Sequence, residues 1–480
     1  MGQLKDYIVA NRVSKKRLSA EIEDERNQKL PQRNAFVLLK KYTKDFFTHG
    51  AQPRMIALSG LRGVGKTTLM WQTANYVFNN HTKEIYFISV DDLNRLNSSL
   101  FDVINVLEKE IFGCTLNELT ERILLMIDEV HEAREWQRDL KILYERGKKI
   151  FILTTGSSAL LLHESPDLAS RWTLMKIFPF KFSEFILAKS WLENTKSIIF
   201  PVKGLASILK TAFFYSVDYS EVKEILESKT KEITSYLTKS AGIIGKDINS
   251  LIDEYVSFHN IARFLPIRNK TIIMDRILAL FDRIMLKDIP EMNMEVYNVF
   301  NRLLFRLALS DEINYESLAG DFNISQKKVE KFIGILNNAE ILNVFLPHGG
   351  ARSRTGKTKK AFFMSPSLRR ALFSRIYGEK FDTTLKAKLY EDILAMYLKN
   401  ILPEGVATFG YGKTKNTDFI IETNTKPMLL EIGINKKNIS QIKSFGNYRY
   451  GLIINSKITG LKFDERNKII FVPLSWILLI

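Results

Sequence analysis

The feature that most restricts the fold is a glycine-rich segment behind a short apolar run. Gly60-Leu-Arg-Gly-Val-Gly-Lys-Thr67 fits the pattern G-x-x-x-x-G-K-[ST], in which backbone N–H groups turn inward around phosphate oxygens. We expect Lys66 to bring a positive charge to the β- and γ-phosphates. A predicted strand, Met55–Ser59, precedes the loop, and an amphipathic helix, Thr67–Tyr76, follows it, as this motif requires. The glycines that permit the turn are Gly60, Gly63 and Gly65.

Two acidic residues follow a second apolar run. Ile123–Ile127 is typical of a central strand buried on both faces, and it leads directly into Asp128 and Glu129. We expect Asp128 and the hydroxyl of Thr67 to hold Mg²⁺, while Glu129 orients and deprotonates the attacking water. Thr68 adds a hydroxyl near the α-phosphate. The predicted ligands are therefore ATP and Mg²⁺, and hydrolysis is the predicted reaction.

A third apolar run, at 150–154, is followed by small residues with hydroxyl groups. In P-loop ATPases of this type a polar side chain here lies between the two acids and the γ-phosphate, and both Thr155 and Ser157 are candidates. Arg171, further along, has two equally weighted interpretations. It either reaches a γ-phosphate, in its own subunit or in a neighbouring one of a homo-oligomer, or it forms a surface salt bridge.

The arrangement of short apolar runs predicts the fold class. Runs at 55–59, 84–90, 123–127 and 150–154 alternate with helical stretches, which is typical of an α/β protein with a parallel sheet. With 45% hydrophobic and 26% charged residues, the chain is neither fibrous nor wholly disordered. It has no apolar stretch of about 20 residues, so no membrane partner is expected. A single cysteine, Cys114, and a charged N-terminus favour the cytoplasm.

Four strings give the chain a family resemblance: GLRGVGKTT, LLMIDEVHEAREW, ILTTGSSALLL and IFPFKFSEF. They are similar to a large prokaryotic family of AAA+/STAND-like ATPases. The resemblance implies a P-loop core with a helical lid, a winged helix and a small C-terminal α/β domain of restriction-endonuclease-like (PD-(D/E)XK) fold. In the family a glycine precedes the arginine at position 171, whereas Ser170 stands here. His131 also matches the family pattern, and we interpret it as a structural or sensing residue.

The predicted domains follow from these patterns. They are an N-terminal helical segment (1–50), the P-loop ATPase core (51–180), a helical lid (181–294), a winged helix (295–380) and a restriction-endonuclease-like domain (381–480).

A helix-turn-helix pattern and a basic cluster predict DNA as a partner. Helices are expected at Val296–Ala308 and Tyr315–Phe322 and, capped by Ser325, in a third segment that runs to Ala339. Residues 351–380 hold nine bases and one acid, in a chain of net charge +17. Wing strands are expected at 341–346 and 360–364, with the loop between them as an exposed tip. A protein partner remains the alternative. The predicted DNA contacts are Gln326, Lys327, Lys328, Arg352, Arg354, Lys357 and Lys360.

Three carboxylates near the C-terminus resemble the D…E-x-K core of restriction endonucleases. Asp418 and Glu431 lie on two neighbouring predicted strands, and Glu391 lies on the helix before them. Together they are a candidate second Mg²⁺ site. The residue two positions after Glu431 is Gly433 rather than lysine. A degenerate site is therefore expected, unless one of two later lysines takes over, Lys436 or Lys437.

Three functions stay open at this point. The first is an ATP-hydrolysing switch that couples nucleotide state to DNA or partner binding. The second is an ATP-regulated, Mg²⁺-dependent nuclease that uses Asp418 and Glu431. The third is a nucleotide-binding signalling scaffold without turnover.

Overall fold

The computed structural model describes residues 2–156, 170–193, 198–288, 294–356, 358–378, 383–410 and 416–480. They form two compact units, Met1–Phe178 and Pro179–Ile480, and each is described by itself. Two predicted site residues, Ser157 and Lys357, lie outside the described residues.

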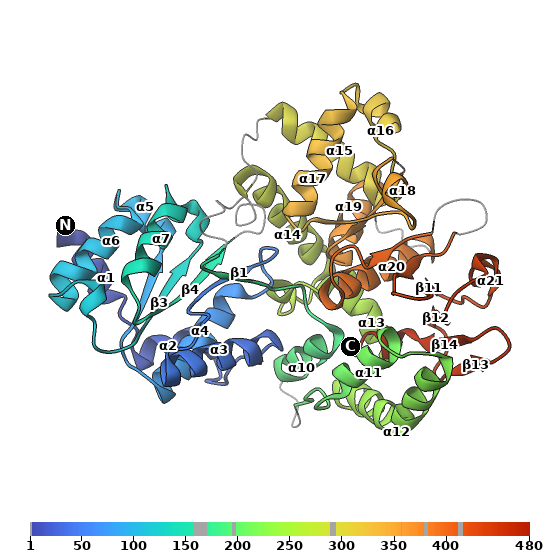
Figure 1. Ribbon diagram of the computed structural model, residues 1–480, viewed down its shortest axis with the longest axis horizontal. Helices are drawn as coiled ribbons and strands as arrows, with labels where there is room; N and C mark the ends of the chain where they lie inside the picture. The colour runs from blue at the N-terminus through green and yellow to red at the C-terminus, as the bar shows by residue number, and fades with distance from the viewer. Residues whose placement is uncertain are drawn as a thin grey trace. The chain divides into compact units, whose positions relative to one another are not determined.

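A five-stranded parallel sheet forms the centre of the first unit (Figure 1), with the order β2-β3-β4-β1-β5. Four strands lie where the apolar runs predict them, and the α/β fold class is confirmed. The fifth strand, β5, was not predicted, because it has no buried residue and so does not form an apolar run in the sequence. The strands are β1 (Met55–Ser59), β2 (Ile85–Ser89), β3 (Ile123–Asp128), β4 (Ile150–Gly156) and β5 (Thr173–Lys176).

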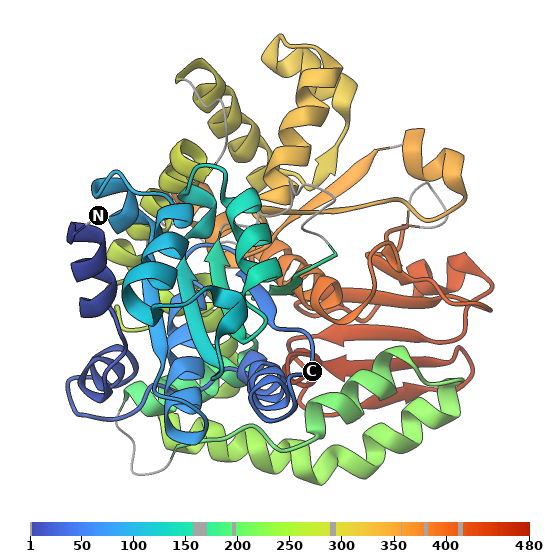
Figure 2. The same cartoon turned by 60° about the vertical axis from the view of Figure 1, so that its left-hand side comes forward.

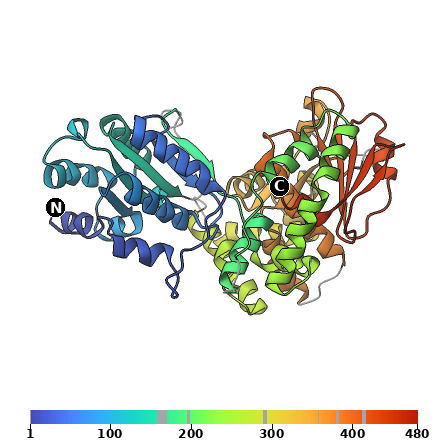
Figure 3. The same ribbon diagram turned by 90° about the horizontal axis from the view of Figure 1, so that it is seen from below.

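Helices cover both faces of this sheet (Figures 1 and 3). Side chains of α1, α6 and α7 pack with alternate residues of the strands in one apolar cluster. On the other face α4 contacts β3 and β4, and it carries α2 and α3 on its outer side. The N-terminal helices are thus part of the first unit. Its helices are α1 (Gly2–Ala10), α2 (Lys15–Ile22), α3 (Ala35–His49), α4 (Lys66–Asn80), α5 (Val90–Arg95), α6 (Leu100–Val106) and α7 (Trp136–Arg146).

The second unit begins with a helical region. A charged cluster lies in its interior, where Lys189 Nζ is 2.7 Å from Glu254 Oε1 and 2.9 Å from Glu193 Oε1. Glu254 also contacts Lys246 Nζ at 2.6 Å and His259 Nδ1 at 3.1 Å. The helices are α10 (Phe182–Leu192), α11 (Leu205–Phe214), α12 (Tyr219–Ile244), α13 (Ile248–Glu254) and α14 (Lys270–Arg283).

Three helices and a small antiparallel sheet, in the order β6-β8-β7, follow along the chain. The Ser325 hydroxyl accepts a hydrogen bond from the N–H of Lys328 at 3.3 Å and caps the third helix. The segment between β7 and β8 is not an open loop throughout, because it contains the short helix α18. The elements are α15 (Met294–Leu309), β6 (Glu312–Ile313), α16 (Tyr315–Phe322), α17 (Gln326–Asn338), β7 (Leu342–Phe345), α18 (Ala351–Gly356), β8 (Lys359–Phe363) and α19 (Pro366–Tyr377).

A six-stranded mixed sheet, in the order β13-β14-β12-β11-β10-β9, completes the unit. The antiparallel strands β10 and β11 form a hairpin, and the short helix α22 follows β14 near the end of the chain. In Figure 2 the long helix α12 runs beneath this sheet, where Lys223 pairs with Glu465 at 2.6 Å. The elements are α20 (Thr383–Ile401), β9 (Ala407–Thr408), β10 (Phe419–Ile421), β11 (Met428–Gly433), α21 (Ser440–Phe445), β12 (Gly451–Asn455), β13 (Lys462–Asp464), β14 (Ile469–Pro473) and α22 (Leu474–Ile477).

A buried arginine ties the parts of the second unit together. Arg369 of α19 has no exposed surface, and its guanidinium pairs with Asp392 of α20 at 2.6 Å and with Asp311 at 2.7 Å. It also donates to the carbonyl of Leu307 on α15 at 3.1 Å. Paired and hydrogen-bonded buried charges of this kind hold the elements in register. In the described ranges no helix has both the length and the hydropathy needed to cross a membrane.

Candidate nucleotide and metal sites

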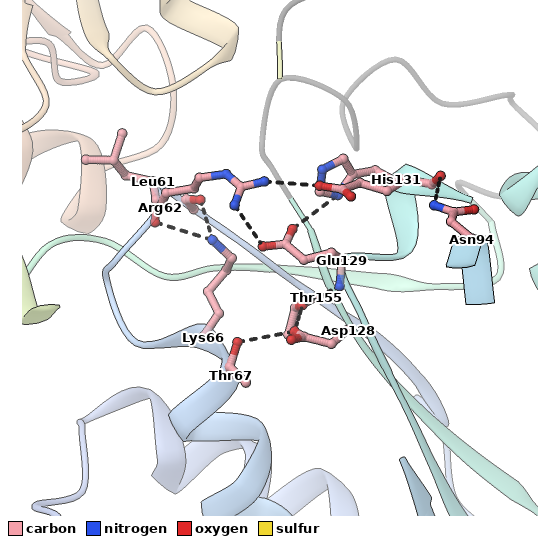
Figure 4. Close-up of polar contacts among 11 residues, drawn as sticks. Leu61, Arg62, Lys66, Thr67, Asn94, Asp128, Glu129, His131 and Thr155 are labelled. Carbon is pink, nitrogen blue, oxygen red and sulfur yellow. Dashed lines mark hydrogen bonds and ion pairs between the residues drawn. The ribbon is translucent and has the colours of Figure 1, made fainter. Parts of the chain in front are cut away.

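The glycine-rich segment forms a tight loop between β1 and α4. Gly60 has a φ of 150°, and a Cβ added there would lie 2.2 Å from the carbonyl oxygen of Ile177, so only glycine fits. Gly65 has a φ of 97° and immediately precedes α4. The buried Lys66 turns its ammonium back over the loop and donates to the carbonyls of Gly60 at 2.8 Å and Leu61 at 3.3 Å (Figure 4). The positive charge therefore lies where the sequence predicts a phosphate.

Oxygen ligands for a hard cation meet at the end of β3. The Thr67 hydroxyl lies 3.2 Å from Asp128 Oδ1, and the Thr155 hydroxyl donates to the same oxygen. Burial raises the pKa of Asp128, which shows that the charged carboxylate lacks full compensation here. A hydroxyl beside an under-compensated carboxylate, next to a lysine, is a donor set that suits Mg²⁺ with a nucleotide phosphate. Thr68 is half-buried one residue further along α4.

Thr155 links the two acids. Its oxygen also accepts a hydrogen bond from the backbone N–H of Glu129 at 3.0 Å. One hydroxyl therefore fixes both the side chain of Asp128 and the backbone of Glu129. Of the two candidates, Thr155, which lies in β4, is the one that the described structure brings to the acids.

Glu129 is held by two side chains in Figure 4. Its carboxylate lies 3.6 Å from Arg62 Nη1 and 3.5 Å from Nδ1 of the buried His131. Arg62 also reaches Glu132 at 3.2 Å. Burial, followed by the hydrogen bond and charge of Asp91, raises the pKa of Glu132 to about 7. The Arg62 contacts were not predicted from the sequence, although the position of this arginine inside the phosphate loop was a signal for them.

Glu129, His131 and Glu132 also bring one ligand atom each within 4.8 Å of one another, the one such group among the described residues. His131 thus lies against the predicted base.

Arg171 forms the salt bridge that was one of its two interpretations. Its guanidinium lies 3.0 Å from Glu145 Oε1 of α7, and it also contacts the hydroxyl of Ser170 at 3.4 Å. Its guanidinium pairs with Glu145 in this structure, and a role at a γ-phosphate stays a prediction.

A lysine takes the place that Gly433 leaves open in the C-terminal sheet. Lys436 Nζ lies 3.0 Å from Asp418 Oδ2 and also pairs with the fully buried Glu431. A Cβ on Gly433 would lie 3.4 Å from the Lys436 side chain, so that side chain packs directly over the glycine. Of the two alternatives, Lys436 reaches the carboxylates and Lys437 is exposed.

Two of the three carboxylates resist ionisation. Burial and the charge of Asp418 raise the pKa of Glu431 to about 8, against the opposing effect of Lys436. Burial and the charges of Asp311 and Asp418 raise the pKa of Glu391 to about 8 as well. Among the described residues, the group whose ligand atoms gather within 4.8 Å is Glu129, His131 and Glu132, so a second Mg²⁺ site at Glu391, Asp418 and Glu431 stays a prediction.

The predicted DNA contacts fall into two groups. Gln326 and Lys327 are exposed, and Lys328 half-buried, in the first turn of α17. Arg354 is not at an exposed tip, because it donates to the carbonyl of Gly349 at 2.9 Å and pairs with Glu422 at 3.1 Å. The half-buried Lys360 lies 5.2 Å from the centre of the Phe409 ring and also acts electrostatically on Glu391. The structure pairs Arg354 with Glu422 and places Lys360 beside Phe409, and contact of these two residues with DNA stays a prediction. Arg352 lies on α18.

The sheet order and the loop define the class of the first unit, an α/β P-loop fold of the AAA type. Residues 52–186 match the protein family described as "AAA domain". The match spans the phosphate loop and both acids. It supports nucleotide binding and ATPase activity in general, with ATP as the implied nucleotide and Mg²⁺ as its usual partner.

Two relatives match over long stretches. An uncharacterized protein of Methanocaldococcus jannaschii is 29% identical, and the alignment covers 100% of this chain and 95% of that protein. An uncharacterized protein of Haemophilus influenzae is 28% identical over 44% of this chain and 58% of that protein.

Solved structures that resemble the chain are more distant. The Thermotoga maritima RuvB Holliday junction branch migration motor is 15% identical with a TM-score of 0.28, covering 65% of this chain and 89% of that one. The Aeropyrum pernix ORC2 protein, in its ADPNP-ADP complexes, is 13% identical with a TM-score of 0.37, covering 75% and 98%.

Proposed function

We propose that the chain is an ATP-hydrolysing switch whose nucleotide state is coupled to DNA binding by a winged helix. The observation that supports it is the convergence of four groups at one end of the parallel sheet. Lys66 supplies the charge, Thr67 and Asp128 supply oxygen ligands, and Glu129 lies beside them. A cytoplasmic location and a homo-oligomeric state remain predictions.

Each group has a distinct task in hydrolysis. Lys66 exchanges its two carbonyl partners for phosphate oxygens, and Thr67 and Asp128 hold Mg²⁺, which neutralises phosphate charge. Glu129 accepts the proton of the attacking water. Thr155 keeps the two acids in register, because its hydroxyl bonds to both residues.

Phosphate release by the Lys66→Ala variant tests the ATPase proposal. Loss of one positive group from a transition state costs about 100- to 1,000-fold in rate, and this is the decrease we expect. Lys436→Ala is the matched control, since it removes a lysine from the other candidate site. Equal turnover by Lys66→Ala and the native protein would leave the scaffold without turnover as the better description.

DNA binding is proposed for the first turn of α17. The order α15, β6, α16, α17, β7, β8 supports a winged helix, and the second helix of such a pair enters the major groove. Replacing Lys327 and Lys328 with alanine should lower the slope of log affinity against log salt by about 2, one for each lost phosphate contact. The control replaces Lys231 and Lys239, exposed lysines of α12. A protein partner becomes the better proposal if duplex DNA neither binds nor changes phosphate release.

Mg²⁺-dependent DNA cleavage at Asp418 and Glu431 is a second candidate function. It is favoured by one specific observation, the ammonium of Lys436 between these two carboxylates. A lysine there stabilises a hydroxide nucleophile, which is the role that Gly433 leaves vacant.

A further inference from the structure

Arg62 joins the phosphate loop to the predicted catalytic base. It lies two residues after Gly60, whose carbonyl already accepts a hydrogen bond from Lys66. Only 11% of its side chain is exposed, and its two terminal nitrogens point to different acids, Glu129 at 3.6 Å and Glu132 at 3.2 Å (Figure 4). One guanidinium therefore bridges the base and a second carboxylate.

The bridge occupies the carboxylate of Glu129, because the guanidinium lies 3.6 Å from one of its oxygens. A second nitrogen, Nδ1 of His131, lies 3.5 Å from the Glu129 carboxylate. With the phosphate loop in this state, the base is held by partners rather than presented to water.

A triphosphate competes for the same guanidinium. Arg62 belongs to the loop whose backbone and lysine receive phosphates, and arginine binds phosphate oxygens as well as carboxylates through paired N–H donors. Glu132 is not part of the predicted hydrolysis machinery; it anchors Arg62, and it also hydrogen-bonds Asp91 and lies near Glu129.

We propose that Arg62 is a γ-phosphate-responsive latch on Glu129. Without a triphosphate, Arg62 holds the base and is itself anchored by Glu132. A γ-phosphate draws the guanidinium away and leaves Glu129 to accept the proton. Arg62 is thus a positioning residue, and the proposal rests on ATP binding at the loop as proposed above.

Nucleotide affinity tests the latch without relying on turnover. The dissociation constants of ADP and of a slowly hydrolysed ATP analogue are measured by calorimetry for the native protein, Arg62→Ala and Arg62→Lys. A charge-assisted contact to the γ-phosphate predicts that Arg62→Ala loses about tenfold of its preference for the triphosphate. Affinity for ADP stays within about twofold. Arg95→Ala, which removes an exposed arginine paired with Asp92, is the control.

Glu132→Gln is expected to act in the opposite direction. It frees Arg62 from one competitor, so triphosphate affinity rises by about threefold while ADP affinity is unchanged. In the Arg62→Ala background the same substitution has no effect, because the anchored group is absent.

The outcomes separate the two proposals. A preference for triphosphate that Arg62→Ala leaves intact overturns the latch but not ATP binding, and so does an effect of Glu132→Gln that persists without Arg62. If the native protein binds neither nucleotide, the proposed function fails and the latch fails with it.

Discussion

Lys189 and Lys436 are two partly buried lysines of the second unit, and each lies against two carboxylates, but the acids around them differ in pKa. Burial alone would raise the pKa of Glu254, beside Lys189, yet hydrogen bonds from His259, Lys189 and Lys246 hold it well below its usual range. Beside Lys436, burial raises the pKa of Glu431 to about 8. Both regions contain lysines and carboxylates, but only beside Lys189 do the neighbouring groups offset the cost of burying the charged carboxylate.

The pKa values of Glu254 and Glu431 differ because different numbers of nitrogen groups lie against the two carboxylates. Glu254 has three nitrogen partners within 3.1 Å. Among the described residues, Lys436 is the lysine that lies against both Asp418 and Glu431, while the charge of Asp418 also acts on Glu391. A structural network satisfies its charges, whereas a site that works on a ligand keeps some of them unsatisfied. The comparison therefore separates a structural cluster from a candidate metal site.

Lys436→Ala gives the largest expected effect. If the cluster is a Mg²⁺-dependent nuclease, loss of the ammonium lowers the rate of plasmid cleavage by about 100-fold or more, because the nucleophile loses its stabilising charge. Cleavage of supercoiled plasmid in Mg²⁺, with and without ATP, is the measurement.

Lys437→Ala is the matched control, since Lys437 is exposed one residue further on. A second variant moves the charge, Gly433→Lys combined with Lys436→Ala, and partial recovery of cleavage is expected. If the native protein does not cleave plasmid DNA, the cluster around Lys436 is not a nuclease site.

Substitution of one acid in each cluster should affect stability with opposite signs. Glu254→Gln removes a charge that Lys189, Lys246 and His259 contact, and we expect it to lower the free energy of unfolding at pH 7 by about 2 kcal/mol. Glu431→Gln removes a carboxylate that burial disfavours, and it should be neutral or stabilising at the same pH. Urea denaturation of both variants measures the difference.

The two acids should change the pH dependence of the free energy of unfolding in opposite directions. The lowered pKa of Glu254 adds stability above its unfolded value of about 4.3, and this contribution is lost as the pH falls below that value. The raised pKa of Glu431 adds stability at low pH, which is lost as the pH rises from about 4.3 through 8. Glu254→Gln should flatten the acid limb and Glu431→Gln the alkaline limb. If both substitutions flatten the same limb of the stability–pH curve, the proposed difference between the two clusters is wrong.

The sequence predicts contiguous features well and tertiary contacts poorly. The phosphate loop and the acids after β3 follow directly from the chain, because strand, loop and helix are neighbours in sequence. The partner of Arg354 is Glu422, which lies 68 residues away, and no local pattern announces it. Lys436 could be named only as one of two alternatives. Its selection depends on the turn after β11, where the side chain folds back over Gly433.

Magnesium without nucleotide gives the smallest expected effect and the most direct one. A cation bound at the carboxylates replaces the missing compensation, so at ten times its dissociation constant it stabilises the folded protein by about 1.4 kcal/mol. Thermal unfolding with and without MgCl₂ measures the shift. Glu431→Gln should abolish it, whereas Glu254→Gln, a less stable protein, should retain it. If Asp128→Asn removes the shift and Glu431→Gln does not, the cation binds at the phosphate loop, and the excess charge around Lys436 must then be assigned to a role other than metal binding.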